Sequence, residues 1–185
     1  MIELRWLEPG EPSAAGVFAL VVTMARAQAA VGWLTVPSRV EVDCWLAEVT
    51  TSGARVVAAY AGDQLVGFGY WARQQAVVLT HSAEIRKIMV HPDAQGQGVG
   101  RAVVGALIAD ATAAGVELLL LDVRGNNHGA LRLYASLGFV VTGRRPDLIA
   151  VGAERFDQVL MHLDVREPST PITRHGSRRE GPGHT

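Results

Sequence analysis

A loop of alternating glycines stands between a predicted strand and a predicted helix, and it constrains the fold more than any other part of the chain. The strand EIRKIMV runs from Glu84 to Val90, and the loop QGQGVGR follows it from Gln95 to Arg101. Glycines let the backbone approach an anion closely, and the unpaired amides of the first helical turn, aided by the helix dipole, point at it. This order of strand, loop and helix predicts a phosphate-binding site.

The spacing of the glycines excludes two common phosphate-binding motifs. The dinucleotide motif Gly-x-Gly-x-x-Gly needs a third glycine, but Arg101 stands there when counting starts at Gly96, and Val103 when it starts one glycine later. The nucleoside-triphosphate loop needs Lys and then Ser or Thr, whereas Arg101 and Ala102 follow Gly100. The pattern that remains is Gln-x-x-Gly-x-Gly.

This pattern and a second one downstream resemble the GNAT superfamily of N-acetyltransferases. The second segment is LLLLDVRGNNHGALRLYASLGF, from Leu118 to Phe139. The superfamily has a strand there, then an asparagine, an alanine and a tyrosine at fixed spacing. Asn127, Ala130 and Tyr134 occupy these places.

The resemblance implies an α+β fold, an α/β/α sandwich whose mixed sheet has about seven strands, with the fourth and fifth parallel and splayed apart. Apolar patterning predicts strands at Ile2–Leu7, Arg55–Ala61, Leu65–Trp71, Glu84–Val90, Glu117–Val123, Phe139–Thr142 and Arg155–Leu163. Helices are predicted at Ala14–Gly32, Arg39–Val49, Val99–Ala114 and Asn127–Leu137. We expect one domain, residues 1–165, and a disordered tail, residues 166–185, which has little apolar content.

The resemblance also implies acetyl-CoA as the acetyl donor. The pyrophosphate would rest on the amides of the glycine loop, and the pantetheine arm would pair with the exposed backbone of the preceding strand. The donor-binding residues that the resemblance implies are Ile88, Met89, Val90, Gln95, Gly96, Gln97, Gly98, Val99, Gly100, Arg101, Asn127, Ala130 and Tyr134. Asn127 is also expected to cap its helix through its side-chain oxygen.

Acetyl transfer to an amine needs a proton donor for the departing thiolate and a group that takes the proton of the amine. The resemblance assigns the first role to Tyr134. Glu84 and Asp122 lie on the two strands that should flank the acetyl group, and both are candidates for the base, directly or through a water molecule. The alternative for each carboxylate is a salt bridge to a neighbouring Arg or Lys.

Three hypotheses about function follow, two of which differ in the acceptor. The segments AEIRKIMVHP, LLLLDVRGNN and GRRPDLIAVGAERFDQVLMHL resemble the small-molecule branch typified by tabtoxin-resistance acetyltransferases, which implies a primary amine of a small molecule attacked directly in a ternary complex. A protein amino terminus, as in the ribosomal-protein N-terminal acetyltransferases, is the alternative that LLDVRGN supports. A non-catalytic CoA-binding regulatory module is a third. Trp33 and Trp45 either line an acceptor pocket or, the favoured interpretation, pack in the core.

Composition argues against several other partners. With 17 basic and 18 acidic residues the net charge is −1, so no nucleic-acid surface is expected. The apolar segment Val17–Leu34 is interrupted by Arg26 and Gln28 and is too short to span a bilayer, so no membrane partner is expected. A homodimer is a further expectation from the fold.

The cysteine and histidine content bears on location and metals. Cys44 is the only cysteine, which excludes an intramolecular disulfide and suits a reducing compartment; it is expected to be buried. No export signal is visible at the start, so we expect a cytoplasmic protein. The six histidines show no ligand spacing, and no metal site is predicted.

Overall fold

The computed structural model describes residues 1–8, 14–27, 32–33 and 35–166. Except for Arg166, the tail for which disorder is expected lies outside these ranges, and so does the stretch 28–31 of the long first helix that the sequence predicts. The domain boundary at residue 165 therefore stays a prediction.

In the described part of the chain, seven strands form one sheet in the order β1-β2-β3-β4-β5-β7-β6, in which only β4 and β5 are parallel neighbours. The strands are β1 (Ile2–Leu7), β2 (Arg55–Ala61), β3 (Gln64–Arg73), β4 (Ser82–Val90), β5 (Leu118–Arg124), β6 (Val140–Val151) and β7 (Glu154–Asp164). The helices are α1 (Ala14–Arg26), α2 (Arg39–Thr51), α3 (Val99–Ala113) and α4 (His128–Ser136), with short 3₁₀ turns η1 (Val77–Leu79) and η2 (Pro92–Ala94). The expected α+β fold with a mixed seven-stranded sheet is confirmed.

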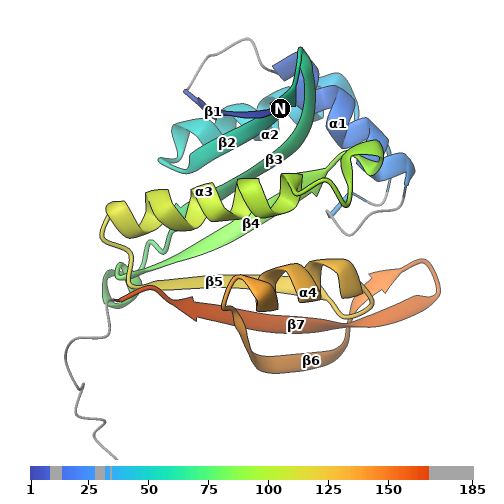
Figure 1. Ribbon diagram of the computed structural model, residues 1–185. Coiled ribbons are helices and arrows are strands. Elements are labelled where there is room, and N and C mark those ends of the chain that lie inside the picture. Colours follow the sequence, from blue (N-terminus) through green and yellow to red (C-terminus); the bar gives the residue numbers. More distant parts are fainter. Residues whose placement is uncertain (9–13, 28–31, 34, 167–185) are drawn as a thin grey trace, which may run out of the picture.

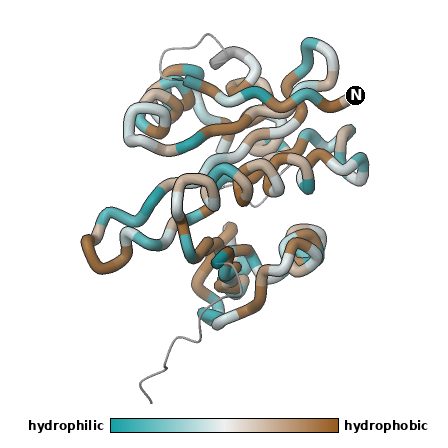
Figure 2. The backbone as a smooth tube through the Cα atoms, turned by 60° about the vertical axis from the view of Figure 1, so that its left-hand side comes forward, coloured by the Kyte–Doolittle hydropathy of each residue, from teal (hydrophilic) through white to brown (hydrophobic). Residues whose placement is uncertain are grey.

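Helices cover both faces of the sheet, because successive residues of a strand point to opposite sides. In β2, Val57 and Ala59 belong to a buried apolar cluster with residues of α3 and Tyr134 of α4. Val56 and Ala58 of the same strand belong to a second cluster with residues of α1 and α2. The result is an α/β/α sandwich (Figure 1). Figure 2 shows apolar stretches in the strands between the two helical layers.

Local signals in the sequence start and stop the helices. Ser38 caps α2 by accepting a hydrogen bond from the Glu41 amide at 3.3 Å, and the Glu41 carboxylate accepts from the Ser38 amide at 2.7 Å. Gly115 follows α3 with a left-handed φ of 75°, as expected. Asn127 caps α4 by accepting from the Ala130 amide at 3.2 Å, which confirms the predicted cap.

Strands β4 and β5 are neighbours over a short distance only. Their pairing covers Ser82–Glu84 and Leu118–Leu120, and the two strands then diverge (Figure 1). Along the rest of its length β4 is held by β3, and β5 is held by β7 from end to end. The splayed parallel pair that the resemblance implied is therefore present.

A bulge in β4 accounts for the divergence. From Arg86 to Met89, β4 advances by three residues while its partner β3 advances by only two. Lys87 lies inside this bulge and has a φ of 53°, in the left-handed region. A bulge bends the strand that carries it and increases its twist. β4 therefore turns away from β5 just beyond their last residue pair.

The predicted sixth strand, Phe139–Thr142, is too short, because β6 continues to Val151. The stretch contains Pro146 and adjacent charged residues, and its register with β7 shifts twice. These irregularities remove the alternation by which a strand is recognised. β6 tolerates them because it is an edge strand, with a neighbour on one side only.

Two further expectations need correction. The first helix was predicted to reach Gly32, but α1 ends at Arg26. Cys44 was expected to be buried and is exposed on α2, because that helix turns Val42 and Leu46 toward the core instead. None of the helices in the described ranges combines the length and apolar character of a membrane span.

Gly67 of β3 tests the packing of α3 on the sheet. A Cβ atom there would lie 2.6 Å from Val99 Cγ1 and 3.0 Å from Ala59 Cβ. Because overpacking costs about 1–3 kcal/mol, we expect Gly67→Ala to lower the free energy of unfolding by about that amount. Gly105 of α3 has no such neighbour within 4 Å, so Gly105→Ala should raise it by ~0.5–1 kcal/mol through helix propensity. Urea denaturation measures both; a Gly67→Ala variant as stable as the parent would contradict this packing.

Candidate active site

A cleft of about 910 Å³ lies where β4 and β5 diverge. On one face of the sheet it is lined by the glycine loop before α3 and by residues of α4. On the other face it is lined by Met24 of α1 and by Ala27 and Gly32 beyond that helix. The cleft therefore passes through the sheet, and molecules that enter from opposite faces can meet at the gap between the two strands.

The glycine loop offers backbone amides to the cleft. Gly96 and Gly98 have φ values of 76° and 83°, a conformation that favours glycine. A Cβ atom at either position would meet no atom within 4 Å, so both face open space. Gly98 is the N-cap residue of α3 and has no side chain to occupy the amides of the first turn. These amides and the helix dipole make the loop suitable for an anion such as a phosphate group.

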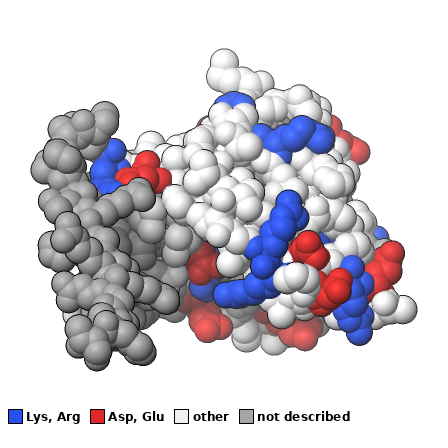
Figure 3. Space-filling model, turned by 90° about the horizontal axis from the view of Figure 1, so that it is seen from below, with Lys and Arg blue, Asp and Glu red and all other residues white. Residues whose placement is uncertain are grey.

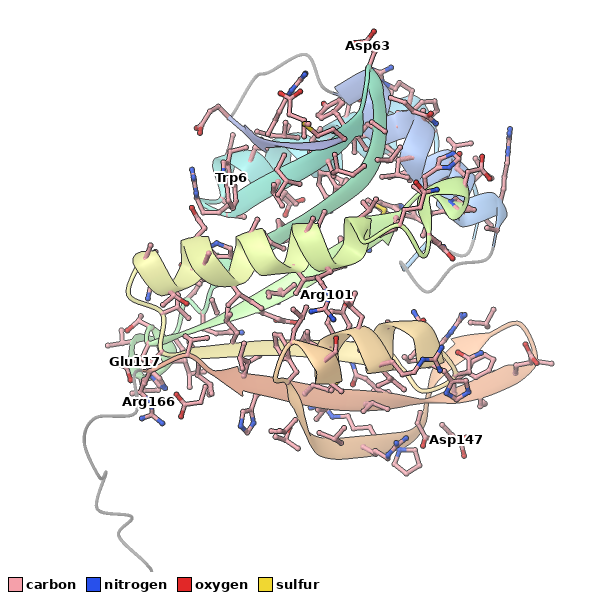
Figure 4. The ribbon with its side chains drawn as sticks, in the orientation of Figure 1. Trp6, Asp63, Arg101, Glu117, Asp147 and Arg166 are labelled. Carbon is pink, nitrogen blue, oxygen red and sulfur yellow. The ribbon has the colours of Figure 1, made fainter. Side chains whose placement is uncertain are left out.

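The start of α3 is tied to α4 across the cleft. A Cβ atom on Gly100 would lie 3.1 Å from Leu133 Cδ2, so the two helices approach closely there. The Arg101 guanidinium reaches from α3 toward α4 (Figure 4) and donates a hydrogen bond to Ser136 Oγ at 2.6 Å. This contact holds a positive charge beside the glycine loop.

Tyr134 places a protonated hydroxyl at the cleft. Its side chain is buried, lines the cleft and packs on Phe139 with the ring centroids 5.8 Å apart. Burial, and to a smaller extent the negative charge of Asp122, raises the pKa of Tyr134 above its usual range. A tyrosine hydroxyl is protonated at neutral pH in any case, and this shift keeps it protonated in more alkaline solution, so a proton is available for donation.

The two predicted carboxylates lie on opposite sides of the gap. Glu84 of β4 and Asp122 of β5 both line the cleft. The Glu84 carboxylate is ion-paired with Arg86, so the salt bridge considered for it is present. Burial lowers the pKa of Lys87, and the negative charge of Asp122 opposes this shift; the same charge adds to the effect of burial that raises the pKa of Tyr134. The cleft thus brings together a proton donor and two carboxylates that can accept a proton.

Most residues predicted to bind the donor line the cleft: Ile88, Val90, Gln95, Gly96, Gly98, Val99, Gly100, Arg101, Asn127, Ala130 and Tyr134. The other two have their side chains elsewhere. Met89 is buried in the apolar cluster beneath α1 and α2, so only its backbone can contribute. The Gln97 side chain donates to the Asp93 carbonyl at 2.7 Å.

The edge of β4 beyond Glu84 is open toward the cleft. Among the described strands, the part from Ile85 to Val90 pairs with β3 only. An extended chain can add to such an edge through backbone hydrogen bonds, as in β-strand augmentation. The open edge runs toward the glycine loop, so it can guide an extended arm from the anion site to the gap.

One lining residue, Lys87, was missed in the sequence analysis. Its ammonium lies 4.3 Å from the ring centroid of Trp33, which itself packs edge-to-face on Trp45 with the centroids 5.0 Å apart. Both tryptophans pack against the cluster beneath α1 and α2, as the favoured interpretation held.

A signal for Lys87 exists in the sequence. Arg86 and Lys87 are adjacent polar residues followed by three apolar ones, which breaks strand alternation and indicates a bulge.

Comparison with known proteins was made on sequence and on structure. The family model described as "Acetyltransferase (GNAT) family" matches residues 19–139. The L-amino acid N-acyltransferase MnaT of Escherichia coli (strain K12) is 30% identical over 130 residues, which are 69% of this chain and 74% of that protein. The [ribosomal protein bS18]-alanine N-acetyltransferase of the same organism is 38% identical over 88 residues, 48% of this chain and 60% of that protein.

A solved structure supports the fold. The GNAT superfamily phosphinothricin acetyltransferase of Sinorhizobium meliloti, in complex with acetyl-CoA, superposes with a TM-score of 0.76 over 94% of this chain and 96% of that chain, at 19% identity. The family model covers more than half of the chain. Together with the 30% identical relative, this match shows that the chain belongs to the GNAT acetyltransferase family.

Proposed function

We propose that the protein transfers the acetyl group of acetyl-CoA to a primary amine of a small molecule, by direct attack in a ternary complex. The cleft through the sheet carries this proposal. Its anion site lies on the α3 face, Tyr134 and the carboxylates of Glu84 and Asp122 lie at the gap, and the α1 face is a second entrance. Two substrates can therefore be bound at once and meet where the proton-transferring groups are.

The residues on the α3 face fit a CoA thioester. The diphosphate would lie on the amides of Gly96–Arg101, where the Arg101 guanidinium adds positive charge. The pantetheine amides would pair with the open backbone of Ile88–Val90. Asn127 and Ala130 line the cleft at the start of α4 and would flank this arm.

The residues at the gap supply both proton transfers. Acetyl-CoA brings an activated acyl carbon, to which the nitrogen of the neutral amine forms a bond as the carbon–sulfur bond breaks. Asp122 or Glu84 takes the proton that the amine loses, directly or through a water molecule. Tyr134 donates its phenolic proton to the departing sulfur. One proton leaves the amine and one reaches the thiolate, so the transfer is balanced, and this set of groups favours turnover over a purely regulatory CoA-binding module.

Relatives favour a small acceptor over a protein amino terminus. The relative named for L-amino acids matches 69% of this chain, whereas the one named for ribosomal protein bS18 matches 48%.

On the face seen in Figure 3, basic and acidic side chains lie near one another, without the single-sign field that attracts nucleic acid. The exposed free thiol of Cys44 suits the cytoplasm. A homodimer stays a prediction.

Gly98 tests the anion site. A residue with a Cβ atom costs about 1–2 kcal/mol in the left-handed region, so Gly98→Ala should misalign the amides at the start of α3 and raise the Kd for acetyl-CoA by about tenfold or more. Gly152 is a matched control, because its φ is 58°, it has no neighbour within 4 Å and it lies in the β6–β7 turn. Gly152→Ala should leave the Kd unchanged. Calorimetric titration checks both, and equal Kd values for the two variants would contradict the site.

Tyr134 tests the proposed chemistry. Removing a general acid lowers the rate by about 100-fold or more, so Tyr134→Phe should reduce kcat by that factor while the Kd for acetyl-CoA changes little. Tyr60 contacts Arg5 and lies on β2, which β3 separates from β4 and the gap, so it provides the control variant Tyr60→Phe. Release of free thiol during turnover is the measurement. Parent-like kcat in Tyr134→Phe would remove this residue from the proton-donor role.

The base is identified by separate Asp122→Asn and Glu84→Gln variants. Loss of the group that takes the proton should lower kcat by about 100-fold or more, and loss of the other carboxylate should lower it less. Both variants keep the size of the side chain and remove only its charge. The same thiol-release assay ranks them, and full activity in both would show that neither carboxylate accepts the proton.

A further inference from the structure

The proposed proton transfers do not use Lys87, although it lines the cleft. Its left-handed φ of 53° is uncommon for a residue with a side chain, and such conformations cluster at functional sites. The bulge directs the side chain toward the layer of α1 and α2, where it meets Trp33. Lys87 therefore lies on the face opposite to the glycine loop, on the side from which the acceptor enters.

Among the described residues, Trp33 and Gly32 adjoin the Lys87 ammonium. The Lys87 ammonium lies 4.3 Å from the centroid of the Trp33 ring. The Trp33 ring is in turn held by its edge-to-face contact with Trp45. Gly32 adjoins the ammonium so closely that a Cβ atom there would lie 2.6 Å from Lys87 Nζ. The side chain is half-buried. Its charge is therefore presented within the cleft, in a defined position.

Three arginines also line the cleft. Arg86 is ion-paired with Glu84. Arg101 lies beside the glycine loop, on the donor face. Arg124 stacks over the ring of Phe156 at 5.0 Å, at the end of β5. Lys87 is a fourth cation in this lining, and it lies on the acceptor face beside Trp33.

The charges on the acceptor side complement a zwitterion. Lys87, Glu84 and Asp122 line the same cleft. Burial lowers the pKa of Lys87, and the negative charge of Asp122 opposes this effect. Glu84 and Asp122 are suited to the amino group that is to lose its proton. An ammonium in the same cleft suits a negative group attached close to that amine.

We propose that Lys87 binds the carboxylate of the acceptor, and that the acceptor is an α-amino acid rather than the amino terminus of a polypeptide. In a polypeptide an uncharged amide replaces this carboxylate and offers the ammonium no ionic partner. The inference rests on the proposed function. It adds the substrate class and the residue that recognises it.

The test compares L-amino acids with their C-terminal amides in the thiol-release assay, using the parent, Lys87→Met and Lys87→Arg. An ionic hydrogen bond contributes roughly 1.5–3 kcal/mol, so Lys87→Met should lower kcat/KM for amino acids by about 10- to 100-fold, mainly through KM. For the amides the value should stay within about twofold of the parent, since no charge pair is lost. Lys87→Arg keeps the charge and should retain most of the preference for amino acids. The Kd for acetyl-CoA and the unfolding midpoint of each variant show that the donor site and the fold are intact.

The outcomes separate the two proposals. Equal loss of kcat/KM for amino acids and amides in Lys87→Met, or no loss for either, would overturn the role of Lys87. A parent enzyme that acetylates amides or peptides but not free amino acids would overturn it as well, while acetyl transfer itself stands. A parent enzyme that transfers acetyl groups to none of these amines would contradict the proposed function and, with it, this inference.

Discussion

Two parallel strands that pair over three residues and then part create the cleft to which we assign the proposed chemistry. The gap leaves part of a strand edge without a neighbouring strand, and the sheet tolerates it because β3 holds β4 and β7 holds β5 on their other sides. The bulge around Lys87 bends β4 away from β5. Without this divergence the sheet would be continuous, and the two helical layers would have no common cleft.

In the proposed function, the two faces of the cleft bind their substrates by different physical means. On the α3 face the proposed donor site consists mainly of backbone: glycines at positive φ, uncapped first-turn amides and an open strand edge. On the α1 face the means are side-chain charges, with Lys87 on Trp33 and Asp122 across the gap. Between them lies the buried Tyr134 hydroxyl, whose pKa burial raises above its usual range. A backbone site suits a donor that never varies, whereas side chains can select an acceptor.

The sequence allowed much of the fold, and most of the residues that line the cleft around the glycine loop, to be predicted, because both depend on local signals. Spaced glycines after a strand, and Asn127 with Ala130 at a helix start, act within a few residues of each other. The position of Lys87 could not be predicted in this way, since it depends on a register shift against β3 and on Trp33, which is far away in the sequence. The length of β6 was also missed, because pairing with β7 overrides an irregular local pattern.

The proposed mechanism requires that both substrates occupy the cleft together, one on each face, and that the amine attacks the thioester directly. Initial rates measured while acetyl-CoA and an amino acid are both varied test this claim most directly. We expect double-reciprocal lines that intersect, because a ternary complex must form before any product leaves. Parallel lines would contradict it, since they indicate that CoA departs before the amine binds and that the acetyl group is carried on the protein.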